Sequence, residues 1–252
     1  MLPNYLIIGA ARCGTTWLAR NLMTHPEIFM HEKKELHFFD WYYDKGIDWY
    51  EREFAGARVK AVGEATPAYL YHERIASLIK RQMPEIKLIV SLRDPVERAY
   101  SAHRFKERER QEQNISVSFA QKASTGSRTI SEGLYFTKLQ RYYDLFEKEK
   151  ILVVLYDELE SDPSEYLRRV HRFLDVRDDF RSPLIGSRIN SSLTKAELFR
   201  QLRNRDSDSD IDVEKVSDET RTTLLRQYYL EDIEKLEGLI HQDLSEWKRA
   251  AQ

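Results

Sequence analysis

Short apolar runs alternate with amphipathic segments along this chain, and this pattern predicts strands and helices in turn. Apolar runs predict strands that end at Gly9 and that span residues 59–62, 86–92 and 151–155. Apolar residues at helical spacing predict helices that open at Trp17 and that cover residues 73–83, 134–146, 163–174 and 218–247, the last as a helix pair. Strands that alternate with helices are typical of a doubly wound parallel sheet flanked by helices. We therefore expect an α/β fold in which residues 1–252 form a single domain.

Three polar stretches interrupt this pattern. Residues 104–112 carry mixed charges and continue a helix that begins at Pro95, so they predict a solvated helical face. Residues 121–132 predict a loop that closes over a bound substrate. Residues 205–210 are acidic and lack apolar periodicity, and they predict an exposed loop.

The first strand leads into a glycine-containing turn, which we call the glycine loop (residues 9–16). It reads Gly-Ala-Ala-Arg-Cys-Gly-Thr-Thr and is followed by a helical pattern. A helix N-terminus presents N–H groups without intrahelical partners, so a strand, turn and helix in this order predict an anion site. Gly9 and Gly14 have the spacing of a nucleotide phosphate loop, but Thr15 stands where that motif has its lysine. With Arg12 as its only cation, the loop predicts a phosphate-containing donor with less charge than a magnesium-bound triphosphate.

A second candidate site follows the strand predicted at residues 86–92. Asp94 is the expected N-cap of the next helix, and Pro95 fits its first turn. Arg93 would then lie at the carboxyl end of a strand, where open α/β sheets bind ligands, and Ser101 would lie about two turns into the helix. A guanidinium and a hydroxyl suit a phosphate monoester. The alternative is that Arg93 only pairs with Asp94 or Glu97 at the helix terminus.

Composition agrees with one enzyme domain. A chain of 252 residues with 41% hydrophobic content is long enough to bury an α/β core. Its net charge of −2 argues against a nucleic-acid partner. One cysteine fits a reducing compartment, and no apolar stretch has the length of a membrane span.

The motifs resemble those of sulfotransferases that use 3′-phosphoadenosine 5′-phosphosulfate (PAPS). The glycine loop is similar to their 5′-phosphosulfate loop, and Leu-Arg-Asp-Pro-Val-Glu-Arg-Ala-Tyr-Ser (residues 92–101) is similar to their 3′-phosphate motif. Lys-Glu-Leu-His-Phe-Phe-Asp (residues 34–40) and Gly-Ile-Asp-Trp-Tyr (residues 46–50) resemble the catalytic stretch of the heparan sulfate branch. Two positions depart from the pattern: the lysine of the family's loop is Arg12 here, and a lysine of the glycan branch is Ala65 here.

The resemblance implies PAPS as donor and PAP as product. It implies that the 5′ side of the donor is bound by Arg12, Cys13, Gly14, Thr15, Thr16 and Trp17. It also implies that Arg93 and Ser101 bind the 3′-phosphate, over which a loop containing Arg188 closes. Because Golgi members carry an anchor and stem before the first strand, and this strand begins almost at Met1, we expect a cytoplasmic enzyme.

Sulfuryl transfer requires a base near the acceptor and positive charge near the leaving phosphate. The resemblance favours Glu35 as the base, with His37 beside the acceptor; a structural role for His37 stays open. Residues two apart point in opposite directions on a strand, so both line one site only if this segment is irregular. Lys34 is expected to be a solvated neighbour. Arg12 cannot donate a proton near neutral pH and would act electrostatically.

Several alternatives remain at this point. The lysine missing at Ala65 is compensated either by Arg12 or by another base such as Lys60. The aromatic residues of 38–50 either stack on the acceptor or pack against the sheet. No divalent metal is expected, since the chain offers no cluster with ligand spacing. A P-loop kinase is disfavoured by Thr15, and a catalytically inactive nucleotide-binding protein by the presence of Glu35 and His37. The acceptor class (carbohydrate, lipid, polyketide or small phenol) stays open.

Overall fold

A computed structural model describes residues 1–111, 119, 126–187 and 216–249 of the chain. The chain forms two compact units, and each is described by itself. The first consists of Met1–Leu92 and Leu145–Ile211, and the second consists of Arg93–Asp144 and Asp212–Gln252.

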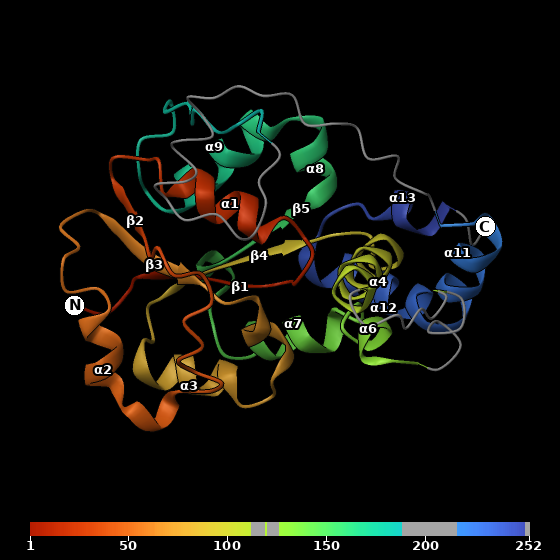
Figure 1. The fold of residues 1–252 in the computed structure, drawn as a ribbon, viewed down its shortest axis with the longest axis horizontal. Helices are drawn as coiled ribbons and strands as arrows, with labels where there is room; N and C mark the ends of the chain where they lie inside the picture. The colour runs from red at the N-terminus through yellow and green to blue at the C-terminus, as the bar shows by residue number, and fades with distance from the viewer. Residues whose placement is uncertain (112–118, 120–125, 188–215, 250–252) are drawn as a thin grey trace. The chain divides into compact units, whose positions relative to one another are not determined.

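The first unit contains a parallel sheet of five strands (Figure 1). The strands are β1 Tyr5–Gly9, β2 Ile28–Met30, β3 Ala61–Ala65, β4 Lys87–Leu92 and β5 Ile151–Leu155. Their order is β2-β3-β1-β4-β5, and every neighbouring pair is parallel. The chain thus builds one side of β1 first and the other side afterwards. This doubly wound arrangement confirms the predicted fold class and brings the carboxyl ends of β1 and β3 to the same edge of the sheet.

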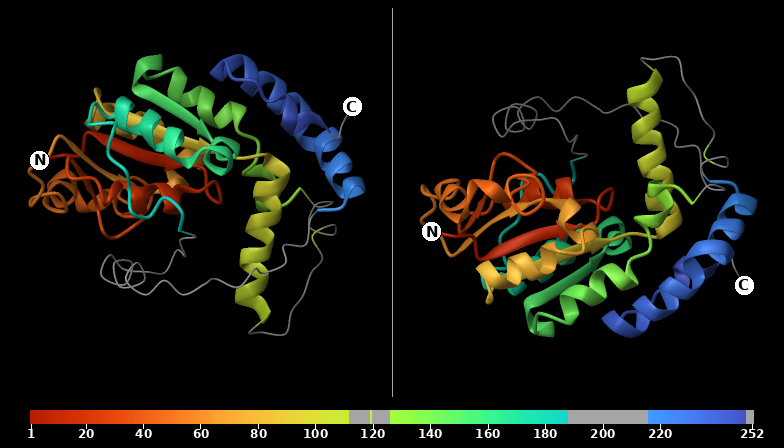
Figure 2. Two further views of the ribbon diagram at one scale, coloured as in Figure 1. Left: turned by 90° about the horizontal axis from the view of Figure 1, so that it is seen from above. Right: turned by 90° about the horizontal axis from the view of Figure 1, so that it is seen from below.

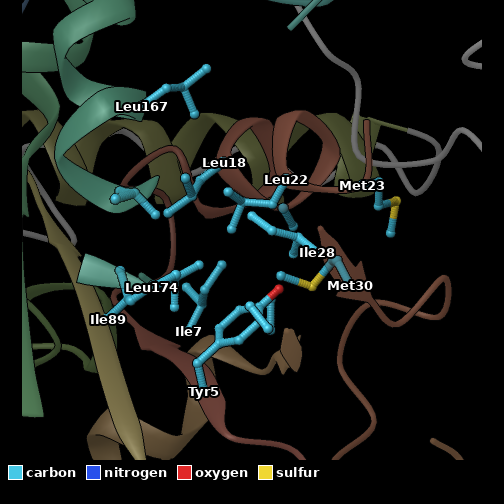
Figure 3. Close-up of a cluster of buried hydrophobic side chains, with 14 of the residues drawn as sticks. Tyr5, Ile7, Leu18, Leu22, Met23, Ile28, Met30, Ile89, Leu167 and Leu174 are labelled. Atoms are coloured by element: carbon cyan, nitrogen blue, oxygen red, sulfur yellow. The ribbon is translucent and has the colours of Figure 1, made fainter. Parts of the chain in front are cut away.

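Helices cover the sheet because each presents an apolar stripe to it. On one face lie α1 Thr15–Leu22 and α9 Pro163–Phe173, while α3 Ile75–Gln82 lies on the other (Figure 1). Figure 3 shows how Leu18, Leu22 and Leu167 pack above Ile7 and Ile89 of the sheet. All five side chains are buried, so this cluster holds α1 against the strand that precedes the glycine loop.

Short elements complete this unit. They are α2 Ile47–Arg52, α8 Tyr156–Ser161 and the 3₁₀ helices Tyr43–Lys45, Pro67–Tyr71 and Lys148–Lys150. The sequence pattern did not predict β2, α2 or α8, because each is too short to show a clear period.

The second unit is helical in its described residues. Its elements are α4 Pro95–Gln111, α6 Arg128–Ser131, α7 Phe136–Tyr143, α11 Asp218–Leu224, α12 Leu230–Ile240 and α13 Ser245–Lys248. A π-helical turn, Leu225–Tyr229, joins α11 to α12, and the three run on as one curved helical rod (Figure 2). The Asp232 carboxylate accepts from the backbone N–H groups of Tyr135 (2.7 Å) and Phe136 (3.2 Å), which ties α12 to the start of α7.

Three predictions about elements need correction. The strand predicted at residues 59–62 is β3, which begins two residues later and ends three residues later, so Glu64 lies inside the strand and does not follow it. The described end of the loop predicted at residues 121–132 contains α6, whose Thr129 and Ile130 are buried, while residues 121–125 and the acidic stretch predicted as a loop at 205–210 lie outside the described residues. The predicted terminal helix pair is one continuous rod followed by the short α13. Tertiary packing and strand pairing decide all three points, and a local pattern does not contain them. In the described parts of the chain, no helix has the length and apolar character needed to cross a membrane.

Candidate active site

The glycine loop joins β1 to α1 as predicted, and contacts from distant residues hold its backbone. The N–H of Ala11 donates to the Tyr71 hydroxyl (2.8 Å), and the N–H of Ala10 donates to the carbonyl of Ser91 (2.7 Å). The Ser91 hydroxyl donates to the carbonyl of Cys13 (2.5 Å). These contacts fix the backbone of the turn. Helix α1 begins directly after it, with its first N–H groups at the carboxyl edge of the sheet.

Two glycines are required by this geometry. A Cβ on Gly9 would lie 2.7 Å from the Cβ of Leu70, so only glycine allows the strand to approach the 3₁₀ helix Pro67–Tyr71. Gly14 has φ +78°, and a Cβ there would lie 3.0 Å from side-chain atoms of Tyr156 and Leu159. The glycines of the motif therefore serve a close approach and a left-handed turn.

The predicted donor-binding residues of the loop differ in exposure. Arg12 is exposed, Cys13 and Thr15 are buried, and Thr16 and Trp17 are half-buried. The Trp17 ring packs edge-on against Tyr166, with 6.0 Å between centroids. Cys13 is therefore a buried filler of the turn, and Arg12 is the side chain of this loop that reaches solvent.

The stretch with the candidate base, which we call the Glu–His segment (residues 34–41), is irregular. Glu35 has φ +66° and His37 has φ +55°. This meets the condition under which both side chains line one site: the Nε2 atom of His37 lies 3.5 Å from Oε2 of Glu35. Positive φ is uncommon for residues with a Cβ, and such positions concentrate at functional sites. In the described residues five non-glycine positions have it, and three of them are Arg12, Glu35 and His37.

Four side chains of the Glu–His segment form a chain of polar contacts. The Nζ atom of Lys34 lies 2.5 Å from Oε1 of Glu35, and Oε2 of Glu35 faces His37. The other ring nitrogen of His37, Nδ1, lies 2.8 Å from Oδ2 of Asp40, whose side chain is only 2% exposed. Such a carboxylate orients an imidazole and sets which nitrogen carries its proton. Asp40 was not among the predicted site residues, although its place three residues after His37 was a usable signal.

Strand β3 and the residues after it hold the backbone of the Glu–His segment. The N–H of Glu35 donates to the carbonyl of Ala65 (2.8 Å), and the N–H of His37 donates to the Thr66 hydroxyl (3.4 Å). Tyr69 accepts from the N–H of Phe39 (3.4 Å) in the same way. The stretch from residue 64 to residue 71 therefore contacts both the glycine loop, through Tyr71, and the Glu–His segment.

Strand β3 also carries a buried carboxyl group, that of Glu64. Glu64 has no exposed surface, and its oxygens accept from the hydroxyls of Thr66 (2.7 Å) and Tyr50 (3.2 Å). Burial disfavours the charged form and raises the pKa of Glu64 to about 7, and these hydrogen bonds offset only part of that effect. Glu64 thus accepts from the Thr66 hydroxyl that bonds the backbone of His37. Its burial was not predicted, because a glutamate inside a strand carries no signal of burial.

The aromatic residues of this region differ in exposure, and Tyr42, Tyr43 and Trp49 are half-buried. Phe38, Phe39 and Tyr50 are buried and pack on one another, as the structural alternative predicted. Trp41 is 66% exposed and its ring stacks on His37, with 3.8 Å between centroids and 8° between planes. Trp41 is therefore the aromatic side chain available to a ligand beside Glu35 and His37.

Arg93 and Ser101 belong to the second unit. Ser101 lies on α4, and the carbonyl of Arg93 accepts from the Tyr135 hydroxyl (2.9 Å). Asp94 caps α4 as predicted, since its Oδ1 atom accepts from the N–H groups of Val96 and Glu97. The carboxylate of Asp94 also pairs with Arg221 of α11.

The side chain of Arg93 also contacts the helix that follows it, as the alternative role expects. Its guanidinium lies 3.9 Å from the Glu97 carboxylate, at the limit of an ion pair, while Arg221 is the cation that contacts Asp94. The side chain of Arg93 is 21% exposed.

Two further expectations meet the structure differently. Lys60 precedes β3 at its amino end, and five residues of strand, about 16 Å, separate it from the edge where Ala65 lies, so it is badly placed to replace the missing lysine. Lys34 is not a solvated neighbour, because its side chain is 17% exposed and paired with Glu35. Arg188 lies outside the described residues. Among the described residues, no group of three or more His, Cys, Asp or Glu side chains is arranged to hold a metal ion.

Comparison with known families agrees with this geometry. A family model described as "Sulfotransferase domain" matches residues 2–224. A mouse heparan sulfate glucosamine 3-O-sulfotransferase 3B1 is 33% identical over 184 residues, which are 70% of this chain and 47% of that protein. The membrane-associated sulfotransferase kil1 of Dictyostelium discoideum is 42% identical over 108 residues, which are 41% of this chain and 23% of that protein. The chain thus spans between about a fifth and a half of the length of these curated relatives.

A solved structure extends the match to almost the whole chain. A sulfotransferase from Alicyclobacillus acidocaldarius superposes with a TM-score of 0.78 and 29% identity, and the match covers 98% of this chain and 99% of that one. The family model covers most of both units, and the motifs that predicted the resemblance lie within it. The chain belongs to the sulfotransferase family.

Proposed function

We propose that this protein, with residues 1–252 as one sulfotransferase domain, transfers a sulfuryl group from PAPS to a hydroxyl or amine of an acceptor. Family membership supports the donor, because the family motifs for the 5′-phosphosulfate and the 3′-phosphate are both present. One observation carries the proposal furthest: Glu35 and His37 are held at the same edge of the sheet as the glycine loop.

The proposed reaction assigns one task to each group. Glu35 takes the proton of the acceptor as the acceptor oxygen or nitrogen forms its bond to sulfur. The bond between sulfur and the bridging oxygen breaks, and PAP leaves with the electron pair. Arg12 and the first N–H groups of α1 stabilise the charge that develops on the 5′-phosphate. His37, oriented by Asp40, lies beside the acceptor.

The remaining donor contacts follow from the motifs. Cys13, Gly14, Thr15, Thr16 and Trp17 form the turn around the 5′-phosphosulfate. Arg93 and Ser101 bind the 3′-phosphate, which Arg recognises through paired N–H donors. A role for Arg188 in closing over that phosphate stays a prediction, as does a cytoplasmic location. No metal ion takes part.

The acceptor is proposed from the relatives and from Trp41. Several relatives act on heparan sulfate, as their names state, so a carbohydrate is one candidate. The exposed indole beside His37 suits a ring-bearing acceptor, since aromatic faces pack on sugar rings and on other apolar rings. Lipid and small-molecule acceptors that present a hydroxyl are equally compatible with this site.

A transfer assay tests the proposal directly. Purified protein is incubated with PAPS carrying a labelled sulfonate and with a panel of glycan, lipid and phenol acceptors, and both PAP release and labelled product are measured. We expect labelled product from PAPS and no phosphorylated product from ATP. Phosphoryl transfer from ATP, or failure to bind PAP, would overturn the assignment.

A further inference from the structure

Lys34 is an unexpected member of the site. Its ammonium lies 2.5 Å from Oε1 of Glu35, and its side chain is 17% exposed although it sits in an irregular segment. The next residue's N–H is bonded to the carbonyl of Ala65, so the backbone that carries Lys34 is fixed against the end of β3. An exposed, flexible lysine would lose rotamer freedom for little gain in such a pair, whereas a half-buried pair is screened less by water.

We propose that Lys34 is a positioning residue that acts through Glu35, both by orienting its carboxylate and by supplying charge during transfer. This inference rests on the proposed function and names a further residue of the same site. Its first part is geometric: Lys34 occupies Oε1, which leaves Oε2, on the His37 side, as the oxygen that receives the acceptor's proton.

The second part follows from charge balance. Before transfer, the Lys34 ammonium is balanced by the Glu35 carboxylate. When Glu35 takes the acceptor's proton it becomes neutral, and the ammonium is left without its counter-charge at that moment. Negative charge develops at the same time on the oxygens of the reacting group, so the uncompensated ammonium stabilises the transition state more than the ground state.

This arrangement also answers what replaces the lysine absent at Ala65. The hydrogen bond between the N–H of Glu35 and the carbonyl of Ala65 places the residue that follows Lys34 in direct contact with that position. A cation on the Glu–His segment thus stands next to the strand end where the side chain at residue 65 is a methyl group.

The test compares Lys34 with its neighbour. Lys34→Met keeps most of the apolar stem and removes the charge, Lys34→Arg keeps the charge, and Lys33→Met is the matched control, because Lys33 is exposed. We expect kcat to fall at least about tenfold in Lys34→Met, which corresponds to 1.36 kcal/mol or more of transition-state stabilisation. Lys34→Arg should recover part of that loss, and Lys33→Met should retain wild-type kcat. PAP affinity by calorimetry and the thermal midpoint should stay close to wild type in all three.

A double-mutant cycle separates action through Glu35 from a structural role. If Lys34 acts through Glu35, Lys34→Met lowers kcat by a smaller factor in the Glu35→Gln background than in the wild type, because there is no carboxylate left to orient, whereas independent effects multiply. Two results would overturn the role of Lys34 and leave the proposed function intact. One is that the two losses multiply, and the other is that Lys34→Met turns over as fast as an active wild type. A wild type that transfers no sulfonate from PAPS to any acceptor would overturn both this inference and the proposed function.

Discussion

The glycine loop and the Glu–His segment lie at the same edge of the sheet, but they are built in opposite ways. The loop sits between a strand and a helix, and Gly9 and Gly14 allow its close approach and its turn, while Tyr71 and Ser91 bond its backbone. The Glu–His segment has no regular structure, and it places Glu35 and His37 at positive φ without glycine. Its backbone is held by Ala65, Thr66 and Tyr69, which come about thirty residues later.

This difference has a functional reason. The loop presents backbone N–H groups, which any sequence supplies once the turn is made. The Glu–His segment presents side chains whose positions must be set individually, and this requires supporting contacts from elsewhere in the fold. Tertiary contacts hold both regions, but the first also has turn glycines in its own sequence, whereas the second has only the tertiary contacts.

The largest expected effect is the loss of turnover when Glu35 of the Glu–His segment is replaced. Glu35→Gln keeps the volume but removes the base, so turnover should fall by about 10²–10⁴ in a steady-state assay with PAPS. PAP affinity, which we assign to the glycine loop and to Arg93 and Ser101, should not change. Near wild-type turnover in Glu35→Gln together with an inactive His37→Ala would transfer the role of base to His37.

The buried carboxyl group of Glu64 should make the free energy of unfolding depend on pH. Glu64 titrates near 4.5 when unfolded, and its pKa in the folded protein is about 7, so the folded state binds the proton more tightly. Stability is then highest below pH 4.5 and falls as the pH rises towards 7, by about 3 kcal/mol from this group at 1.36 kcal/mol per pH unit.

Urea unfolding at pH 5 and pH 8 measures this effect. Glu64→Gln accepts from one of the two hydroxyls and can donate its amide N–H to the other, and it should gain stability relative to the wild type at pH 8 but not at pH 5. Glu147→Gln, at an exposed glutamate, serves as the control. Parallel pH curves for wild type and Glu64→Gln would show that Glu64 does not titrate in this range.

A smaller effect tests the donor contact that lies in the second unit. A paired guanidinium contact to a phosphate contributes about 1.5–3 kcal/mol, so PAP should bind at least about tenfold tighter than adenosine 5′-monophosphate. Arg93→Ala should remove most of that preference and leave the monophosphate affinity nearly unchanged, while Arg52→Ala, at an exposed arginine, should keep it. Calorimetric titration of both nucleotides measures this. Equal affinities in the wild type would contradict the donor assignment itself.

No effect is expected from metal removal. The glycine loop lacks the lysine of triphosphate sites, and the transferred sulfuryl group is neutral, so Arg12 and N–H donors suffice. Turnover after treatment with a chelator should equal the untreated rate. A loss that magnesium restores would favour a phosphoryl-transfer enzyme.

Much of the fold was predictable because its elements are long enough to show a period. The strands ending at Gly9 and spanning Ile151–Leu155, and the helices at α3, α7 and α9, lie close to their predicted positions. The ends of β3 were misplaced, because its Gly63-Glu64-Ala65 stretch lacks the apolar residues by which a buried strand is recognised. Hydrogen bonds from the hydroxyls of Tyr50 and Thr66 to its oxygens help to stabilise Glu64 there.

The candidate site divides along the same line. The glycine loop, Glu35, His37 and Arg93 were identifiable in the chain, because turn glycines, a capping aspartate and a short motif are local signals. The pairing of Lys34 with Glu35, the orientation of His37 by Asp40 and the support from Thr66, Tyr69 and Tyr71 were decided by the tertiary structure alone. An irregular segment has no period from which side-chain directions follow, and its conformation is selected by hydrogen bonds to residues that only the folded sheet brings near.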